Sequence, residues 1–420
     1  MDSLGDRRSA RLGIANRALA EVGKAFADPN VVFSLLVRQL GGSNVLVGLL
    51  STLRYAGWFL PQLFVAHYVQ RRAVRGRLYC AAELFRCAGY GVLVLLLLVV
   101  SDRAVLLPLF FAVFAVSYLG HGVGSVPRFD VIGRVVPSVE RGTFFARSNL
   151  AAGLLGFGAG FVVRALLEGG EVGPPLSRYA ILILLSIAFF VFAVVAFARI
   201  REPERRTVEK RVSLSESIRA IPDLLRTDRV YRRLVGVIVL TDVARRVTDP
   251  FYIVFATEIL GVPASYAGIY LALLVASKVG ANLLWERIAV RFGNHRVLQG
   301  AAVASLAIPV AALLFALLAP RLGAAAGPAF GSLFALMGLR DSGKYVGKRT
   351  VFLDHVAVEE WPIRWGILNT LLGVVSLLPI VAGTMIDAIG YGVTFGAVSA
   401  VAAAGFSLSL RIGAAEEEAT

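Results

Sequence analysis

Long apolar segments alternate with short polar connections along the whole chain, and this alternation predicts its secondary structure. A run of about 20 mainly apolar residues is long enough to cross the hydrocarbon core of a membrane as a helix. The pattern predicts an all-α polytopic membrane protein with twelve transmembrane helices. The predicted spans are residues 13–38, 43–69, 77–101, 104–134, 142–167 and 177–200, followed by 230–257, 263–290, 295–319, 324–352, 363–389 and 391–412.

The spacing of the spans divides the chain into two six-helix bundles joined by a polar segment. In that segment Ser213 and Glu216 form a capping box that predicts a surface helix, which Pro222 should kink or shorten. The helix is interpreted as an interfacial strap or, alternatively, as a regulatory or lipid-sensing element. The predicted parts are an N-terminal bundle at 1–200, a basic cytoplasmic linker at 201–229, a C-terminal bundle at 230–412 and an acidic cytoplasmic tail at 413–420.

The two predicted bundles repeat one another in sequence. Glu21–Pro29 and Asp242–Pro250 share one pattern 221 positions apart: an acid, two spacers, a base, three spacers and Asp-Pro. Because six is an even number of spans, the second copy enters the membrane in the orientation of the first, and a substrate path is expected between the halves. Further pairs, all offset by 220, are Leu40-Gly41 and Leu260-Gly261, Gly48 and Gly268, Arg71 and Arg291, Glu140 and Glu360, Asn149 and Asn369, and Gly153 and Gly373.

Each copy of the repeat places three ionised side chains within an apolar segment. An ionised side chain at a helix centre costs roughly 2.5 to 3.5 kcal/mol on insertion scales, so these groups should face the protein interior. Their i, i+3, i+7 spacing puts each set on one helical face, and the Asp-Pro pair that ends each set should bend the helix. Two interpretations remain: a substrate- or ion-binding site, or ion pairs that lock one helix to another. The two stripes are Glu21, Lys24 and Asp28, and Asp242, Arg245 and Asp249.

Composition and charge support a membrane location. With 57% hydrophobic residues, 17% charged residues and a mean hydropathy of +0.73, the chain is too apolar for a soluble protein. The net charge of +15 comes largely from Arg and Lys in the connections, so it indicates membrane topology and not nucleic-acid binding. The positive-inside rule then places both termini in the cytoplasm, and the Arg-rich, Lys-poor usage suggests a bacterial source. The basic connections hold Arg71, Arg72, Arg75 and Arg77, then Arg134 and Arg141, then Arg291, His295 and Arg296.

One of these connections resembles a family signature. The stretch from Trp285 to Leu298 is similar to the cytoplasmic loop of the major facilitator superfamily, Gly-x-Leu-Ala-Asp-Arg-x-Gly-Arg-Arg, and residues 66–77 are its first-half counterpart. The resemblance implies that family's fold of two pseudo-symmetric bundles and transport by alternating access. Gln70 and Val290 stand where the signature has aspartate, which weakens the case for its charge-relay latch. The residues expected to gate transport from these loops are Gln70, Arg71, Arg291 and Gly293.

In the fold that this resemblance implies, the first, fourth, seventh and tenth spans line a central cavity. His121 in the fourth span could carry a proton, or could serve as a hydrogen-bonding packing residue. Glu83 and Arg86 in the third span are interpreted as a structural pair at the margin of the cavity. The predicted substrate-binding or ion-coupling residues are Glu21, Lys24, Asp28, Arg54, His121, Asp242, Arg245, Asp249, Lys278, Arg340, Asp341 and Lys344.

Among these candidates six bases and five acids nearly balance, which favours a small zwitterionic, anionic or hydrogen-bonding solute. We expect secondary active transport of such a solute across the cytoplasmic membrane, with protons as the coupling ion and Asp28 and Asp249 as the first candidates for carrying them. One alternative is efflux of drugs or other hydrophobic compounds, although span five lacks the Gly-Pro pair of the family's antiporter signature. Another is a sensor or interaction protein of the same fold that transports nothing.

Nothing in the sequence indicates an enzyme. It contains no Gly-x-x-x-x-Gly-Lys-Ser/Thr loop for nucleotide phosphates, and its four His and two Cys are dispersed. Cys80 and Cys87 lie on one face of the third span and are interpreted as packing residues. We expect no cofactor and no metal, and a monomer suffices because two parallel halves already enclose a cavity.

Overall fold

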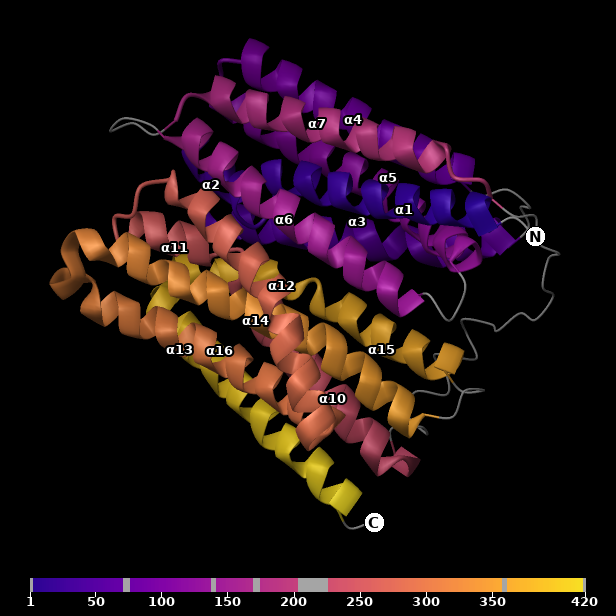
Figure 1. Cartoon of the computed structure of the whole chain (residues 1–420). Coiled ribbons are helices and arrows are strands. Elements are labelled where there is room, and N and C mark those ends of the chain that lie inside the picture. The colour runs from indigo at the N-terminus through magenta and orange to yellow at the C-terminus, as the bar shows by residue number, and fades with distance from the viewer. Residues whose placement is uncertain are drawn as a thin grey trace. The chain divides into compact units, whose positions relative to one another are not determined.

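The computed structural model describes residues 3–70, 76–136, 141–168, 174–202, 226–356 and 361–417. Helices account for the regular secondary structure of these ranges, which confirms the predicted all-α fold class (Figure 1). The chain divides into two compact units: residues 1–209 with 263–272, and residues 210–262 with 273–420. The predicted linker helix with its capping box lies outside the described residues.

The first unit contains the helices that the first six spans predicted. The first predicted span consists of two helices, and each of the next five is a single helix. The helices are α1 (Ser3–Phe26), α2 (Val32–Gln39), α3 (Asn44–Gln70), α4 (Gly76–Val99), α5 (Arg103–Val135), α6 (Arg141–Leu167) and α7 (Leu176–Ala198).

The second unit contains the helices of the remaining spans, although α12 begins in the stretch that is grouped with the first unit. Gly390, at φ 83° and ψ 167°, interrupts α16 and separates the eleventh predicted span from the twelfth. The helices are α10 (Arg229–Thr248), α11 (Tyr252–Glu258), α12 (Tyr266–Phe292), α13 (Asn294–Leu322), the short 3-10 helix η2 (Gly323–Ala325), α14 (Ala326–His355), α15 (Trp361–Val375) and α16 (Leu378–Glu417).

The Asp-Pro pair of the repeat breaks the helix in both units. Proline lacks a backbone N–H and disfavours helical geometry in the residue before it. Accordingly α1 ends two residues before Asp28 and resumes as α2 at Val32, while α10 ends just before Asp249 and resumes as α11 at Tyr252. The expected bend is therefore a complete break, after which a glycine with positive φ ends each short second helix. These glycines are Gly41, at φ 87°, and Gly261, at φ 65°.

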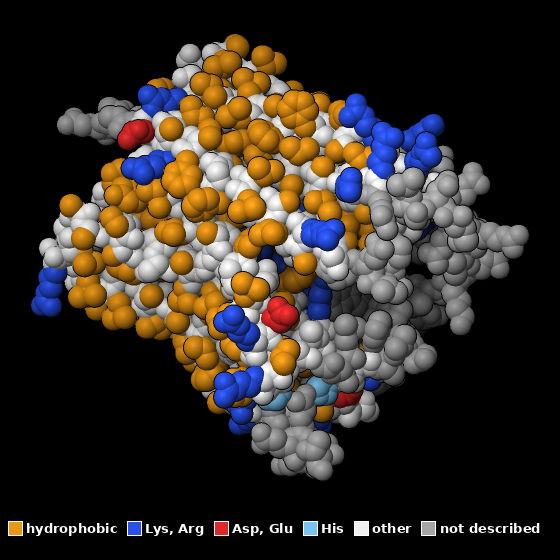
Figure 2. All heavy atoms as spheres, in the orientation of Figure 1, with side chains coloured by type: hydrophobic (Ala, Val, Ile, Leu, Met, Phe, Trp, Pro, Cys, Tyr) orange, Lys and Arg blue, Asp and Glu red, His pale blue; other side chains and the backbone are white. Residues whose placement is uncertain are grey.

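Apolar side chains cover the outside of the helices. In the described part of the chain, eight helical segments are long and apolar enough to cross a membrane. Helices α1 and α10 are outside that group because their charged stripes lower their hydropathy. Figure 2 shows hydrophobic side chains over most of the visible described surface, with fewer Lys and Arg side chains among them. Exposed Val99, Leu154 and Leu317 illustrate a surface suited to lipid and unusual for a soluble monomer.

Glycines on two faces of α5 allow close packing against both of its neighbours. A Cβ atom on Gly122 would overlap the carbonyl oxygen of Gly57 in α3. On the opposite face, a Cβ on Gly124 would lie 3.2 Å from the Cβ of Ala82 in α4, and one on Gly120 would press on Phe85. Small residues let helix backbones approach closely in membranes. The segment of α5 around residue 121 is therefore held tightly between α3 and α4.

An ion pair joins the start of α10 to α15. Asp228 caps α10, because its Oδ1 accepts a hydrogen bond of 2.8 Å from the backbone N–H of Tyr231. Its Oδ2 pairs with Arg364, whose guanidinium lies 4.8 Å from the centre of the Tyr231 ring. The hydroxyl of Tyr231 donates to the carbonyl of Arg364 over 2.6 Å. These contacts fix α15 to α10 where their spans begin.

Candidate functional site

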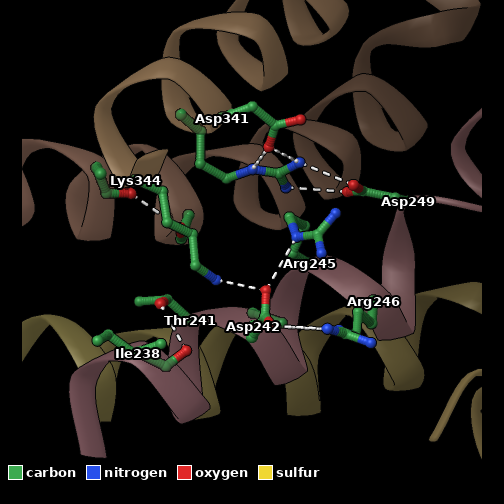
Figure 3. A network of polar contacts seen from close by, with 12 residues as sticks. Ile238, Thr241, Asp242, Arg245, Arg246, Asp249, Asp341 and Lys344 are labelled. Carbon is green, nitrogen blue, oxygen red and sulfur yellow. Dashed lines mark hydrogen bonds and ion pairs between the residues drawn. The ribbon is translucent and has the colours of Figure 1, made fainter. Parts of the chain in front are cut away.

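The charged stripe of α10 faces a second charged stripe on α14 within the second unit (Figure 3). Arg340 of α14 binds the Asp249 carboxylate at the end of α10 in a bidentate manner. Its Nη1 and Nη2 donate to the two oxygens of Asp249 over 2.9 and 2.8 Å. The same guanidinium donates to Asp341 from Nε over 3.0 Å and from Nη2 over 2.9 Å. Arg340 is 1% exposed, so this fork on a carboxylate is a buried, charge-assisted contact.

Asp242 accepts hydrogen bonds from three other bases of the network. Lys344 of α14 donates to its Oδ1 over 2.6 Å, and Arg245 donates to the same oxygen over 3.1 Å. Arg246 donates to Oδ2 over 3.1 Å. The i, i+3 and i+4 spacing on α10 places both arginines beside Asp242, while Lys344 reaches it from the facing helix. The carboxylates of α10 therefore join two helices at membrane depth.

Positive charge is in surplus in this network. Arg245 is 20% exposed by its side chain and Asp341 26%, so one edge of the network is accessible. Lys278 of α12 is exposed, and its charge acts on Asp341; the charge of Lys348 acts on Asp242. Around the three carboxylates Asp242, Asp249 and Asp341 lie six bases, namely Arg245, Arg246, Lys278, Arg340, Lys344 and Lys348.

The corresponding stripe of the first unit is open. Lys24 and Glu21 pair at 3.3 Å, but their side chains remain 43% and 33% exposed. Asp28 is half-buried, and its Oδ1 accepts a 2.9 Å hydrogen bond from the backbone N–H of Asn30. Within the described residues, no basic nitrogen lies within ion-pair distance of Asp28. Arg54 of α3 is half-buried, and its charge acts on Lys24, so four predicted residues share this face.

The 220-residue repeat explains why the two stripes differ. At the positions of Arg340 and Lys344 in α14, the repeat places Gly120 and Gly124 in α5. These glycines pack against α4 and have no side chain with which to reach α1. Among the described residues, Asp28 consequently has no base on a facing helix like the one that binds Asp249.

A second polar cluster lies in the first unit, where α4 meets α5. Glu83 forms an ion pair with Arg86, and its Oε1 lies 2.8 Å from Nδ1 of His121. The Arg86 guanidinium lies 3.6 Å from the centre of the Phe190 ring. The Trp58 ring of α3 lies 4.9 Å from the imidazole, centre to centre, in a tilted arrangement. Glu83 and Arg86 thus form the pair that was predicted, and Glu83 also binds His121.

An asparagine orients another base on α5. Asn16 of α1 is fully buried, and its amide donates to the hydroxyl of Tyr79 over 2.9 Å and to the carbonyl of Ala193 over 2.8 Å. Its Oδ1 accepts a 3.1 Å hydrogen bond from Nε of Arg128. Arg128 lies seven residues after His121, on the same face of α5. The repeat places Lys348 of the second unit at the position of Arg128.

The predicted gating residues are described in part. Arg71 lies outside the described residues, and of Gln70 only the backbone is described, as the last residue of α3. Arg291 is exposed near the end of α12, and Gly293 joins α12 to α13 at φ 88°, a conformation that favours glycine.

The corresponding region of the first unit carries a charge relay that begins at the start of α4. The backbone N–H of Gly76 donates to Glu202 over 2.9 Å. Glu202 pairs with Arg134 at 3.4 Å, and Arg134 pairs with Asp130 at 2.6 Å. These contacts connect the start of α4 to the end of α5.

Several contributing residues were absent from the predicted site. Helical periodicity could have found Arg246 and Lys348, which follow Asp242 and Lys344 by four residues. A buried amide in an apolar run was the available signal for Asn16. No spacing rule indicates that Glu83 reaches His121, because they lie on different helices and 38 positions apart.

Comparison with known proteins identifies relatives of this fold. The family model of the Major Facilitator Superfamily matches residues 18–339. The structure of a mutant of the nucleoside transporter NupG aligns with a TM-score of 0.73 at 12% identity, over 96% of this chain and 99% of that one. An inward-facing bacterial homologue of the iron transporter ferroportin gives 0.71 at 15%, over 98% and 99%. A D-xylose-proton symporter gives 0.64 at 14%, over 97% and 96%. No curated protein sequence matches the chain significantly.

Proposed function

The chain belongs to the major facilitator superfamily, and on that premise we propose that it is a proton-coupled secondary transporter of a small anionic or zwitterionic solute. Family and fold make it a multi-pass membrane transporter rather than an enzyme. In this proposal it works as a monomer by alternating access in the cytoplasmic membrane, with both termini on the cytoplasmic side. The basic connections support that orientation.

The surplus of bases over carboxylates in the second unit is the observation that best supports an anionic group on the solute. An ion-pair network that served only to lock helices would gain nothing from extra cations, because each ionised side chain at membrane depth costs roughly 2.5 to 3.5 kcal/mol. Here Lys278 is exposed and Arg245 partly exposed, next to the accessible Asp341. A carboxylate or phosphate on the solute would add negative charge beside these bases, whereas a large hydrophobic drug would add none.

Asp28 is the group that best supports proton coupling. Its carboxylate bonds to a backbone N–H and to no base within the described residues, so it can accept a proton without breaking an ion pair. Asp249, the other candidate, is clamped by Arg340. The D-xylose-proton symporter that shares this fold is compatible with this mode of coupling. We therefore assign the coupling proton to Asp28 and a chiefly binding or structural role to Asp249.

Transport by purified protein in liposomes tests the proposal. The solutes are radiolabelled lactate, succinate, glutamate, alanine and phosphate, with glucose as a neutral reference. We expect saturable uptake of at least one anionic or zwitterionic member, driven by an inward proton gradient. Asp28→Asn should lose gradient-driven uptake and retain solute exchange, because exchange requires no net proton movement. Lys278→Gln should raise the half-saturating concentration of an anion.

A matched control separates coupling from general damage. Asp387→Asn removes an exposed carboxylate from α16 of the second unit and should leave uptake unchanged. Gradient-driven uptake that persists in Asp28→Asn contradicts the coupling assignment. Transport of glucose alone contradicts the anionic class. Absence of transport for every solute, by folded protein, favours the sensor or interaction protein.

A further inference from the structure

The hydrogen bond between Glu83 and His121 fixes which ring nitrogen of the histidine carries hydrogen. Glu83 is ion-paired with Arg86, so its carboxylate is ionised and can only accept hydrogen bonds. Nδ1 of His121 must therefore be the donor in the 2.8 Å contact with Oε1 of Glu83. A neutral imidazole has one N–H, which leaves the lone pair on Nε2.

Nε2 lies on the accessible side of the ring. The side chain of Glu83 is 5% exposed, whereas that of His121 is 25% exposed. Within the described residues, Nε2 has no hydrogen-bond partner and is not among the buried polar atoms. Trp58 of α3 and Tyr118 of α5 pack around the ring, with centroids 4.9 and 6.0 Å away. A proton can thus reach the lone pair while the opposite edge of the ring remains bound.

We propose that His121 is a second proton-binding residue of this carrier, that it takes the proton on Nε2, and that Glu83 is the residue that positions its ring. Proton uptake from a hydronium ion forms one N–H bond on Nε2, breaks one O–H bond of the donor and releases water, and it converts the existing contact with Glu83 into an ion pair. The inference rests on the proposed proton coupling and adds a site to it. In the repeat, Asp341 occupies the position of His121, so each unit carries a titratable group there.

The neighbouring charges give this proton a function. On α4, Glu83 favours the charged ring and Arg86 opposes it, while on α5 Arg128 opposes it. Arg128 lies seven residues along the same helical face, about 10 Å away by helix rise. Protonation therefore adds positive charge to a face that already presents a base oriented by Asn16. An anionic solute would be held there better with the proton than without it, which is the requirement for cotransport.

Nitrogen-15 NMR of histidine-labelled protein tests the site without any solute. The chain has four histidines, and His121→Asn assigns the signals of interest by their loss. At about pH 8 we expect His121 as the Nδ1–H tautomer, the opposite of the one that prevails in free histidine, and at about pH 5 as a doubly protonated ring. In Glu83→Gln the ring should stay neutral across this range, because the two arginines then act without the carboxylate. An Nε2–H tautomer at about pH 8, or a ring that never charges in the wild type, overturns the proposal.

A transport measurement distinguishes a proton site from a packing residue. For the solute of the liposome panel that moves, wild-type uptake should change with pH between about 5 and 7, and His121→Asn should remove most of that dependence. His355→Asn is the control, because it removes another histidine of the chain, whose Nδ1 lies 2.9 Å from the backbone carbonyl of Val351. An unchanged pH profile in His121→Asn overturns the proposal even if the NMR tautomer is as expected. A panel that shows no transport contradicts the proposed function instead, and the NMR result then decides whether the residue binds a proton.

Discussion

Removal of Arg340 should be among the most destabilising single changes in the second unit. The guanidinium is 1% exposed and Asp249 is 5% exposed, so Arg340→Gln leaves a carboxylate buried without its partner. Two unit charges about 4 Å apart attract by roughly 4 kcal/mol at an effective dielectric constant of about 20. Breaking one side of a buried pair typically costs about 3 to 5 kcal/mol, which agrees with that attraction. We expect a loss of this size in the free energy of unfolding.

The assay is unfolding in mixed micelles, followed by circular dichroism as denaturing detergent is added. Arg349→Gln is the matched control: it removes an exposed arginine from the same helix, where Arg349 bonds to the hydroxyl of Tyr345, and it should cost no more than about 0.5 kcal/mol. The double variant Arg340→Gln/Asp249→Asn should recover part of the loss, because no buried charge then remains unpaired. Wild-type stability in Arg340→Gln, or additive losses in the double variant, would refute the reasoning.

Two further predictions concern the backbone conformation of Gly390 and the ion pair between Asp228 and Arg364. Gly390→Ala should lower the free energy of unfolding by about 1 to 3 kcal/mol, because a backbone at φ 83° and ψ 167° is accessible essentially to glycine alone. The control is Gly392→Ala, which should be neutral or stabilising because a Cβ atom at Gly392 meets open space. Equal effects of the two substitutions would contradict the argument from backbone strain. At Asp228 partial burial raises the pKa, but hydrogen bonds from Arg364 and the N–H of Tyr231 outweigh it and hold the pKa below its usual value. The ionised form therefore contributes stability above the unfolded-state pKa, and that contribution is lost as the pH falls through the lower folded-state pKa. At neutral pH the free energy of unfolding of the wild type should exceed that of Asp228→Asn by roughly 0.5 to 1 kcal/mol. Thermal unfolding at a series of pH values should show this difference disappearing in acid. A difference that grows in acid would contradict the assignment.

The sequence predicted the elements of this fold better than their side-chain pairing. Apolar segment length and the repeat located the helices, and the repeated Asp-Pro pair marked the two breaks. The charged stripes of α1 and α10 looked equivalent in the sequence, because only the spacing of residues along each helix could be compared. Their difference depends on the facing helix, where Arg340 in one unit corresponds to Gly120 in the other. The bond between Glu83 and His121 likewise depends on how closely α5 packs against its neighbours, which no periodicity reveals.

The contact between Lys344 and Asp242 reduces what Lys344 can contribute to solute affinity. A solute anion that binds Lys344 shares its ammonium group with a carboxylate that already accepts a hydrogen bond from it at 2.6 Å. Because this charge is already partly neutralised, the contact with Lys344 adds less to affinity than a contact with an unpaired lysine would. Weak affinity brings rapid release, since among related complexes dissociation rates follow affinity more closely than association rates do. A built-in competitor of this kind favours turnover over capture, as suits a protein that must let go of what it binds on the far side of the membrane.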